Sequence, residues 1–598
     1  MTSDPIPPPA LTDPWEPFIE SIAAGLAAGA RTAGVSVETA AVLGQLNLSP
    51  GAEGEFALPV HRIAAAAHRP APDLAAAIAT GFPPTQGVLG AKATGAYVNV
   101  RVDPIALVRT TLEVVFQLGE RYGHRPSTGP RACVEHTSAN ATGPFHIGRV
   151  RNAIIGDTFA RTLRASGVPV TTQYYVDDMG RQAAMITWIW SMARDHWPLP
   201  IREAVDGNEV PGEKPDAHRG RPYPALSAYL KEHPEAQAEV AEIVHRLETG
   251  GAPPRHHELT QSILDGMLSS LGRLGVSFDE FVWESRFVAD GSVERVLARL
   301  RAAPHAAREE NGALAIETAS YGLPKESTRV IVQRGNGTSL YVTRDIAYHL
   351  EKFSRFARVI DVLGQDHQLH ARTLDALLAE IGEPRRPEFI IYQDITVPDG
   401  GRMSTRGGSA VWLDDLLREA VERARREVIA RRDDLAEAEI DRIAEAVATS
   451  AIRYHIARVA PEKPVVFRWE DALSFEGRSG PFVQYSYARA ASLLRKADGL
   501  APPYPFDPAI LSDPEELALV RVVAHLPRAV AYAARSTHVQ GIAAYAHDLA
   551  DQFNRFYHAV PVLKSEAERP SRVALVAAVR QALGNSLDLL GVTRLESM

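Results

Sequence analysis

The sequence contains a single cysteine, Cys133, among its 598 residues. One cysteine excludes an internal disulfide and any structural zinc site built on several cysteines. Long apolar runs are also missing, because none approaches the roughly 20 residues that a membrane-spanning helix needs. The opening stretch MTSDPIPPPALTDPWEPF is Pro-rich and acidic and lacks the charged, then apolar, then small-residue order of a secretion signal. We therefore expect a cytoplasmic protein without membrane contact.

Lysine is scarce as well, with eight lysines against 56 arginines. Since alanine is abundant, we attribute this bias to genome composition. The net charge of -9 argues against a protein that binds a polyanion over its whole surface. It does not exclude nucleic-acid binding, because phosphate contacts need only local basic patches. At roughly 100–200 residues per domain, the length predicts three to five domains.

Strands and helices alternate through the middle of the chain. This pattern predicts a parallel sheet with helices on both faces, an α/β Rossmann-type domain. The pattern is interrupted across 198–325, which we interpret as an insertion between two halves of the fold. The expected strands are 132–136, 169–176, 328–333, 339–343, 358–363 and 388–397, and the clearest helices are 147–166 and 369–381.

Regions with other patterns of predicted secondary structure flank this domain. The N-terminal part, with helical stretches near 16–33 and 71–80 and the alternating strand AYVNVRV (96–102), predicts a small α/β unit. After Trp412 the chain reads as amphipathic helices to its end, which predicts an all-α domain. The predicted domains are therefore 1–105, a linking helix at 106–128, a Rossmann-type domain at 129–415 with the insertion at about 198–325, and a helical domain at 416–598.

The segment TSANATGPFHIGRVRNAIIGD joins an expected strand to an expected helix. A helix N-terminus after a Gly/Pro turn presents unpaired N–H groups and a positive dipole, which suit phosphate. Gly143 and Gly148 allow close approach of the backbone, and His146 and Arg149 add donors. The alternative is an ordinary turn with exposed His and Arg. The loop has neither GxGxxG nor GxxxxGK[ST], so hydride transfer and P-loop chemistry find no support.

A second Gly-rich loop, PDGGRMSTRGG (398–408), follows the last expected strand. Its Arg402, Ser404, Thr405 and Arg406 could cover a pyrophosphate leaving group, because cationic groups stabilise charge that develops on a transferring phosphate. Taken alone, a polar surface turn explains the same residues.

Together these loops resemble the signatures of class I aminoacyl-tRNA synthetases. PFHIG resembles HIGH, and ANATGPFHIGRVRNAIIGD is similar to the arginyl-tRNA synthetase version, where an archaeal-type subgroup often has Arg at the place of Arg149. PDGGRMSTRGG resembles the KMSKS loop, with Arg402 and Thr405 at its two Lys positions. YYVDDMGRQ (174–182) also resembles the family, which commonly has Asn where Asp177 stands. The resemblance implies a Rossmann-type catalytic domain between an N-terminal additional domain and a C-terminal helical bundle. It also implies ATP with Mg²⁺, no dedicated metal site, and nucleotide contacts from His146, Gly148, Arg149, Arg402, Ser404 and Arg406.

A guanidinium substrate calls for carboxylates, which bind it in planar, bidentate pairs and reject lysine by shape. Glu135 ends the strand before the HIGH-like loop, and Asp345 lies in LYVTRDIAYHL. A carboxylate at a strand end is often merely solvated. The resemblance to arginyl-tRNA synthetases at both places implies that Asp345 binds the guanidinium and Glu135 the α-amino group, although which carboxylate takes which end stays open. Asn140, Tyr341 and His367 are implied to complete the pocket. Two other kinds of class I synthetase fit less well. The zinc site of the synthetase for cysteine and the editing insertion of the synthetases for branched-chain amino acids have no counterpart in this sequence.

The segment 472–497 places Phe482, Tyr485, Arg489 and Arg495 on one expected helix. Interleaved aromatic and Arg side chains suit single-stranded bases, where stacking contributes ~1–3 kcal/mol per base. A core helix with a solvated rim is the alternative. The segment resembles the anticodon-binding bundle of arginyl-tRNA synthetases, which implies a further contact at Met598. In the N-terminal unit, Tyr97 and Asn99 match the pair with which the family's additional domain contacts the tRNA D-loop.

The implied reaction joins arginine, ATP and tRNA(Arg) to give arginyl-tRNA, AMP and pyrophosphate. The arginine carboxylate attacks the α-phosphate, so no protein nucleophile is needed, and positioning and charge stabilisation carry the catalysis. The resemblance also implies transfer to the 2′-hydroxyl of the terminal adenosine and a requirement for bound tRNA during activation. We expect a monomer. Two alternatives stay open: a paralogue for specialised metabolism or antibiotic self-protection, motivated by the 402–406 residues, and a catalytically inactive tRNA-binding protein.

Overall fold

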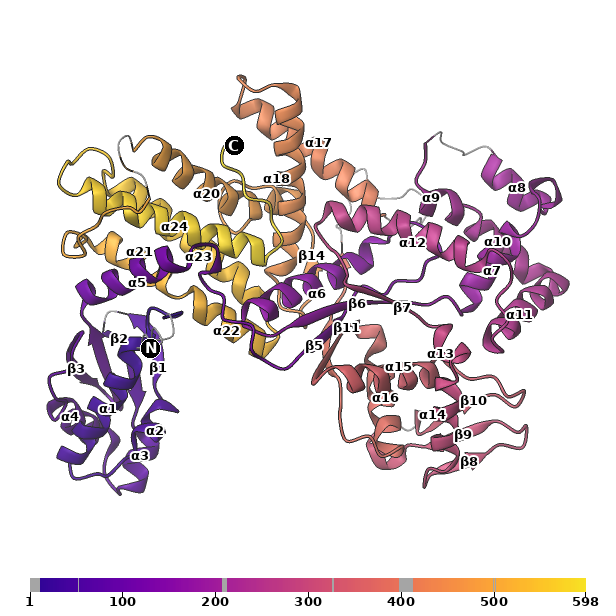
Figure 1. The fold of residues 1–598 in the computed structure, drawn as a ribbon, viewed down its shortest axis with the longest axis horizontal. Helices are drawn as coiled ribbons and strands as arrows, with labels where there is room; N and C mark the ends of the chain where they lie inside the picture. The colour runs from indigo at the N-terminus through magenta and orange to yellow at the C-terminus, as the bar shows by residue number, and fades with distance from the viewer. Residues whose placement is uncertain are drawn as a thin grey trace, which may run out of the picture.

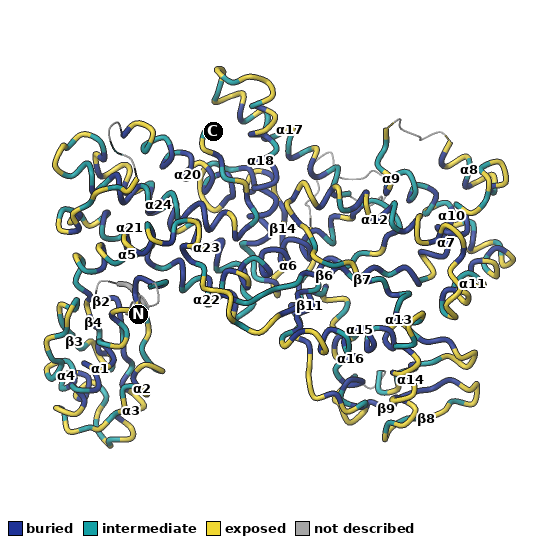
Figure 2. Tube along the Cα trace, viewed as in Figure 1, coloured by how far each residue is buried: buried dark blue, intermediate teal, exposed yellow. Residues whose placement is uncertain are grey.

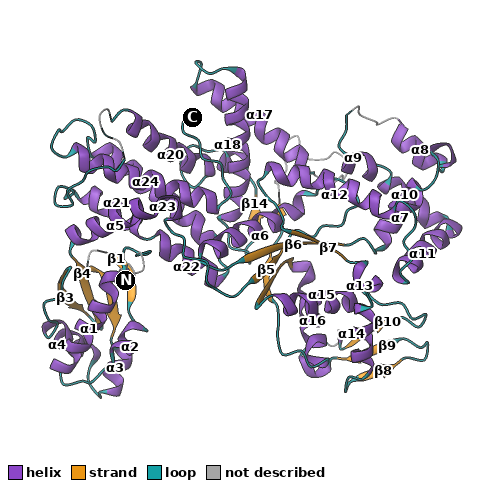
Figure 3. Cartoon of the chain, viewed as in Figure 1, coloured by secondary structure: helices purple, strands orange, loops and turns teal. Residues whose placement is uncertain are grey.

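The computed structural model describes residues 11–51, 53–206, 212–324, 327–396, 412–497, 500 and 502–598. Figure 1 shows a small N-terminal unit at one end, a helical bundle above it, a parallel sheet at the centre, and the 198–325 region at the other end. Helices dominate everywhere except in the N-terminal unit and the central sheet (Figure 3). Buried segments concentrate where the bundle meets the sheet, around α6 and α18 (Figure 2).

The N-terminal unit is a four-stranded antiparallel sheet of order β1-β2-β4-β3 packed against helices. Trp15, Leu26 and Leu74 lie in its core together with Val98 and Val100, which point inward from alternate positions of β4. The next helix, α5, begins at Pro104 after Asp103, whose side chain accepts a hydrogen bond from the Ile105 amide. The unit consists of α1 (Glu16–Thr32), α2 (Thr39–Leu43), β1 (Asn47–Gly51), β2 (Gly54–Pro59), α3 (His61–Ala66), α4 (Ala71–Thr80), β3 (Val88–Thr94) and β4 (Tyr97–Val102), and α5 (Pro104–Leu118) follows it.

The central sheet confirms the predicted α/β class. Five parallel strands lie in the order β12-β11-β5-β6-β7, so the strand order reverses between β5 and β11. Helix α6 packs on the face formed by Ala132 and Val134, whereas Cys133 points to the opposite face, against α15 and α16. The core elements are β5 (Ala132–Glu135), α6 (Ile147–Ala165), β6 (Val170–Val176), α7 (Arg181–Trp190), α15 (Tyr341–Arg355), β11 (Arg358–Gly364), α16 (Gln368–Glu380), β12 (Glu388–Tyr392) and the short β13 (Ile395–Thr396).

The 198–325 region corrects part of the sequence interpretation. It is mostly helical, but its strand β7 (Glu280–Trp283) pairs in parallel with β6 and belongs to the central sheet. Four residues, EFVW, were too short to stand out in a helical stretch. The region also supplies β8 (Ala306–Arg308) and β9 (Leu314–Glu317), which pair antiparallel with β10 (Arg329–Gln333). Its helices are α8 (Leu199–Asp206), α9 (Pro215–Gly220), α10 (Tyr223–Glu232), α11 (Pro234–Glu248), α12 (His256–Arg273), α13 (Arg286–Ala289) and α14 (Ser292–Arg301).

The expected strand at 339–343 is also wrong, because helix α15 begins at Tyr341. Two β-branched residues in LYVTRD favoured a strand, but the segment's apolar residues repeat with helical spacing, and Val342 and Ile346 pack together in one core. Asp345 therefore lies in the first turns of a helix and not at the end of a strand.

The C-terminal part is a bundle whose helices α18, α20, α23 and α24 share one apolar core. Arg453, fully buried on α18, donates to the carbonyls of Leu274 and Leu590 at 2.6 Å each and pairs with Asp157 of α6, which ties the bundle to the central domain. Among the residues described from 412 onward, β14, paired with β13, is the one strand in an otherwise helical part. The elements are α17 (Leu413–Arg431), α18 (Glu437–Ala457), β14 (Val465–Val466), α19 (Trp469–Ala472), α20 (Gly480–Arg495), α21 (Pro514–Ala524), α22 (Leu526–Ser536), α23 (Gln540–Ala559) and α24 (Arg569–Leu589).

One stretch of the described residues, Pro514–Ser536, has the length and apolar composition of a membrane-crossing helix. In this fold it comprises α21 and α22, and its Leu519, Val523 and Leu526 are buried in the core of the bundle.

Candidate active site

A cavity of about 780 Å³ opens at the carboxyl ends of β5 and β11, where the strand order of the sheet reverses. Open parallel sheets bind ligands at such a switch point. The cavity brings together six residues that the sequence predicted from four separate segments: Glu135, Asn140, Arg149, Tyr341, Asp345 and His367.

Glu135 and Asp361 are partners in register on the adjacent strands β5 and β11. Side chains at such positions point to the same face, so two carboxylates lie next to each other. Lys352, fully buried on α15, separates them: its Nζ donates to Asp361 Oδ1 at 2.7 Å and to Glu135 Oε2. Ser138 Oγ donates to the other oxygen of Glu135 at 3.0 Å. Burial raises the pKa of Glu135, and Lys352 opposes that shift.

Asp345 is held by two histidines. His349 Nδ1 lies 3.0 Å from Asp345 Oδ1, and His370 Nε2 lies 2.6 Å from Asp345 Oδ2. Burial by itself would raise the pKa of Asp345, but the histidines hold that pKa far below its usual range. The carboxylate thus stays ionised while its remaining lone pairs face the cavity, which suits a cationic ligand.

His349 links this group to the neighbouring strand, because its Nε2 lies 2.7 Å from Asp361 Oδ2. Burial and Lys352 lower the pKa of His349, but the two aspartates outweigh them and raise it to about 10. The imidazole is therefore a buried cation between two carboxylates.

Tyr175, Asp177 and Glu284 also line the cavity. Glu284 is buried and forms an ion pair with Arg344. Burial raises its pKa to about 8, against the effect of Arg344. Asp177 caps its own turn by accepting from the Gly180 amide at 3.0 Å.

The HIGH-like loop ends at His146, the residue that caps α6. Its backbone is extended, and its Nδ1 accepts from the Gly148 amide at 3.0 Å. Desolvation of the ring and the nearby Arg149 lower the pKa of His146, which favours this acceptor role. Arg149 lines the cavity and lies 3.7 Å from Asp366, whereas His146 and Gly148 are not among the lining residues. Arg402, Ser404, Thr405 and Arg406 lie outside the described residues.

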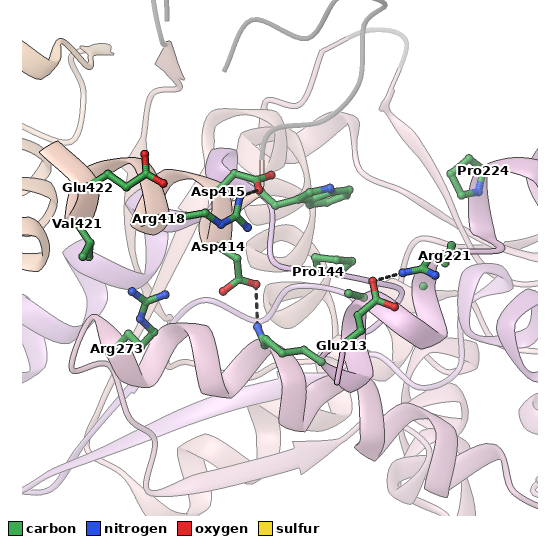
Figure 4. A pocket seen from close by; sticks show the side chains of 14 residues that line it. Pro144, Glu213, Arg221, Pro224, Arg273, Asp414, Asp415, Arg418, Val421 and Glu422 are labelled. Carbon is green, nitrogen blue, oxygen red and sulfur yellow. Dashed lines mark hydrogen bonds and ion pairs between the residues drawn. The ribbon is translucent and has the colours of Figure 1, made fainter. Parts of the chain in front are cut away.

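The other side of His146 meets the first residues of α17. The Trp412 ring lies edge-on to the His146 ring at 5.9 Å, and the Leu413 amide donates to the Phe145 carbonyl at 2.8 Å. Trp412 and Pro144 also line a second cavity of about 770 Å³. Figure 4 shows its walls, where charged side chains pair across it, as Lys214 does with Asp414 at 2.8 Å.

In the helical bundle, a cavity of about 370 Å³ gathers four of the predicted tRNA-contacting residues: Tyr485, Arg489, Arg495 and Met598. The Arg489 guanidinium lies between the rings of Tyr485 and Tyr557, 4.7 and 4.8 Å from their centroids. Phe482 is not part of this cavity. It is half-buried beside His547, with ring centroids 5.5 Å apart.

The predicted pair in the N-terminal unit lies on β4. Tyr97 is 45% exposed, with its ring edge-on to His61, and Asn99 is half-buried. An exposed aromatic at the end of a strand is free to stack on a base.

Several site residues escaped the sequence reasoning: His349, Lys352, Asp361, Glu284 and His370. The periodicity held a usable clue, because Asp345, His349 and Lys352 fall at i, i+4 and i+7 and so share one face of a helix. Because 339–343 was predicted as a strand, the shared helix face of these three residues was not recognised. Among the described residues, no group of three or more His, Cys, Asp or Glu side chains is arranged to hold a metal ion.

The parallel sheet, the cavity at its switch point and the HIGH-like loop capping a helix define a nucleotide-binding synthetase domain. In agreement, residues 113–469 match the family described as tRNA synthetases class I (R), catalytic domain, and residues 483–598 match the DALR anticodon binding domain. The class is thus that of the class I aminoacyl-tRNA synthetases.

Relatives narrow the class further. Arginine–tRNA ligase of Methanocella arvoryzae is 41% identical over 529 residues, covering 88% of this chain and 90% of the relative. That of Methanothermobacter thermautotrophicus is 42% identical, covering 84% and 86%. The Thermus thermophilus arginyl-tRNA synthetase structure superposes with a TM-score of 0.79 at 28% identity, covering 97% of this chain and 100% of that chain. The chain belongs to the arginyl-tRNA synthetase family.

Proposed function

We propose that this chain charges tRNA(Arg) with arginine, using ATP, and that the 780 Å³ cavity at the switch point is where arginine binds. The observation that carries the proposal is the meeting of Glu135 and Asp345 in one cavity, although 210 residues separate them in the sequence. Two carboxylates that line one cavity suit a substrate with a guanidinium at one end and an ammonium at the other.

Asp345 is assigned to the guanidinium and Glu135 to the α-amino group, with Asn140, Tyr341 and His367 completing the pocket. Tyr341 is 62% exposed and lies beside His370, so its ring can cover a bound side chain. Asn140 donates to Gln182 Oε1 at 2.9 Å, which leaves its own amide oxygen to accept from an ammonium group.

The nucleotide is assigned to the mouth of the same cavity. Arg149 lines it and can reach a phosphate, while the N-terminus of α6 provides N–H groups and a positive dipole beside it. His146, Gly148, Arg402, Ser404 and Arg406 complete this assignment. Mg²⁺ is assigned to the phosphate oxygens of ATP, since it keeps most of its waters and seldom needs an all-protein cage.

The tRNA is assigned to the helical bundle and to the N-terminal unit. The anticodon is assigned to Phe482, Tyr485, Arg489, Arg495 and Met598, and the D-loop to Tyr97 and Asn99. The domain limits 1–105, 106–128, 129–415 and 416–598 belong to the same proposal, as do a cytoplasmic location and a monomeric state.

The test is ATP–pyrophosphate exchange with each of the twenty amino acids, run with and without tRNA(Arg). We expect exchange with arginine alone, and only when tRNA is present. Exchange with another amino acid would overturn the specificity, and tight tRNA binding without any arginine-dependent AMP release would favour an inactive tRNA-binding protein. Failure to complement a strain that lacks its housekeeping enzyme, despite soluble and active protein, would favour the specialised paralogue.

A further inference from the structure

Behind the proposed arginine site runs an unbroken chain of charged side chains, with Lys352, Asp361 and His349 buried and the two end carboxylates half-buried. Glu135 contacts Lys352, Lys352 contacts Asp361, Asp361 contacts His349, and His349 contacts Asp345. Each link is a direct side-chain contact, and the signs alternate along the whole chain. The members come from three elements: β5, β11 and the face of α15 that points at the sheet.

Resting on the proposed function, we infer that Lys352 is a positioning residue for arginine, and that with Asp361 and His349 it fixes the two carboxylates of the site relative to each other. Lys352 is fully buried and has no direct access to the cavity, so it acts through Glu135 and Asp361. Its Nζ also lies over the Tyr348 ring at 4.0 Å, which leaves the ammonium little freedom to move.

Within this group of five side chains the charges nearly cancel. Three carboxylates and two cations, Lys352 and protonated His349, leave one net negative charge on the group. Without Lys352, Glu135 and Asp361 would face each other on neighbouring strands, where like charges repel and one of them takes up a proton.

An ion pair that only stabilises the fold can be distinguished from one that positions a binding residue by replacing one or both of its partners. Replacing both partners of a buried pair with neutral groups often restores stability, whereas removing one partner leaves an uncompensated charge. The double variant Lys352→Met/Asp361→Asn removes one charge of each sign, so it keeps the net charge of the group at its original value. It does not restore the contact that holds Glu135 in place.

The experiment measures steady-state aminoacylation by the full chain with saturating tRNA(Arg), determining KM separately for arginine and for ATP. For Lys352→Met we expect the arginine KM to rise at least about tenfold, with the ATP KM within about twofold, because a buried charge contact is lost on the amino-acid side only. Thermal melting of each variant is recorded alongside.

The double variant decides the role. We expect its Tm to recover toward that of the wild type while its arginine KM stays raised. A wild-type arginine KM in Lys352→Met, or an arginine KM that recovers together with Tm in the double variant, would overturn the inference. If Lys352→Met does not fold, the double variant alone gives the answer by the same criterion.

The matched control is Arg572→Met, which breaks the buried pair of Arg572 with Glu516 (2.7 Å) inside the helical bundle. It should lower Tm and leave the arginine KM unchanged. The proposed function itself fails on a different result, namely a wild-type chain with no arginine-dependent charging, so the two failures are distinguishable.

Discussion

The two cavities assigned to substrates are charged in opposite ways. In the central domain, the carboxylates assigned to arginine are half-buried, and each is already paired with a buried cation behind it, as Glu135 is with Lys352 and Asp345 with His349. In the bundle, the cations are near the surface: the Arg495 side chain is 54% exposed, and Lys496 is exposed as well.

This difference follows from what each cavity must hold. A small cation with a fixed shape is selected by carboxylates whose positions are set in advance, which requires burial and a supporting set of contacts. A polyanion is attracted by cations that remain hydrated and adaptable, and its bases are held by stacking. Substitutions in the first cavity should therefore change catalysis, and those in the second should change RNA affinity.

The largest expected effect comes from Asp345→Asn. The amide keeps the size of the carboxylate but removes the charge that pairs with the guanidinium, so kcat/KM for arginine should fall by at least about 100-fold. The dissociation constant for tRNA(Arg) should stay within about twofold, because the residue faces the small cavity. Aminoacylation assays and filter binding measure the two quantities.

Asp366→Asn is the matched control, since Asp366 lines the same cavity but its side chain is 62% exposed. We expect it to lose far less activity than Asp345→Asn. Charging by Asp345→Asn at the wild-type rate would remove arginine recognition from this cavity.

On the RNA side, Tyr485→Ala should weaken tRNA(Arg) binding by ~1–3 kcal/mol if a base stacks on the ring. The arginine KM measured at saturating tRNA should not change. Tyr532→Ala is the control, because Tyr532 is 53% exposed on α22 and does not line this cavity. Unchanged affinity in Tyr485→Ala would mean that the ring serves only to hold Arg489.

The central cavity should also give the protein a distinctive pH dependence. The pKa of His349 is raised to about 10 in the folded state, against about 6.5 in an unfolded chain. Because the folded pKa is the higher one, its stabilisation is complete below about pH 6.5 and is lost as the pH rises toward 10. We expect Tm to fall over that interval and expect the fall to be smaller in His349→Asn.

Asp345 should make Tm fall at the acid end as well. Its pKa is depressed in the folded state, so its contribution to stability is lost as the pH falls below about 4. His196→Asn, at a side chain that is 75% exposed, should leave the Tm profile unchanged. A wild-type Tm that is constant from pH 6.5 to 10 would contradict a protonated His349.

The sequence predicted the fold class, and it also pointed to six residues that line one cavity, because both results depend on local patterns. Apolar runs separated by Gly-rich turns indicated parallel strands, and Glu135 and Asp345 fell in segments that resemble a known family. The charged side chains behind these residues could not be predicted in the same way. Lys352 looks like any lysine of a helix, and only the pairing of β5 with β11 shows that it separates two carboxylates.

Strand β7 was missed in the sequence for a related physical reason. Its four residues carry no periodicity of their own, and they form a strand because the open edge of β6 provides hydrogen-bond partners. Within a helix, too, the local pattern does not show which side chains line a cavity: Phe482 lies one turn from Tyr485, yet its ring is beside His547 while Tyr485 lines the bundle cavity.

The smallest expected effect is the most direct test of the contrast between the two cavities. Lys496 lines the bundle cavity and is exposed, so a phosphate contact there would release counterions without adding specificity. Lys496→Met should reduce the slope of log K for tRNA(Arg) against log salt by about one, with only a small loss of affinity at moderate salt. Lys564→Met, at an exposed lysine outside this cavity, should leave the slope unchanged. In both variants the arginine KM at saturating tRNA should respond little to salt, because buried charges are screened far less than exposed ones. An arginine KM that rises with salt as steeply as the tRNA dissociation constant would mean that the carboxylates of the central cavity are hydrated like the cations of the bundle.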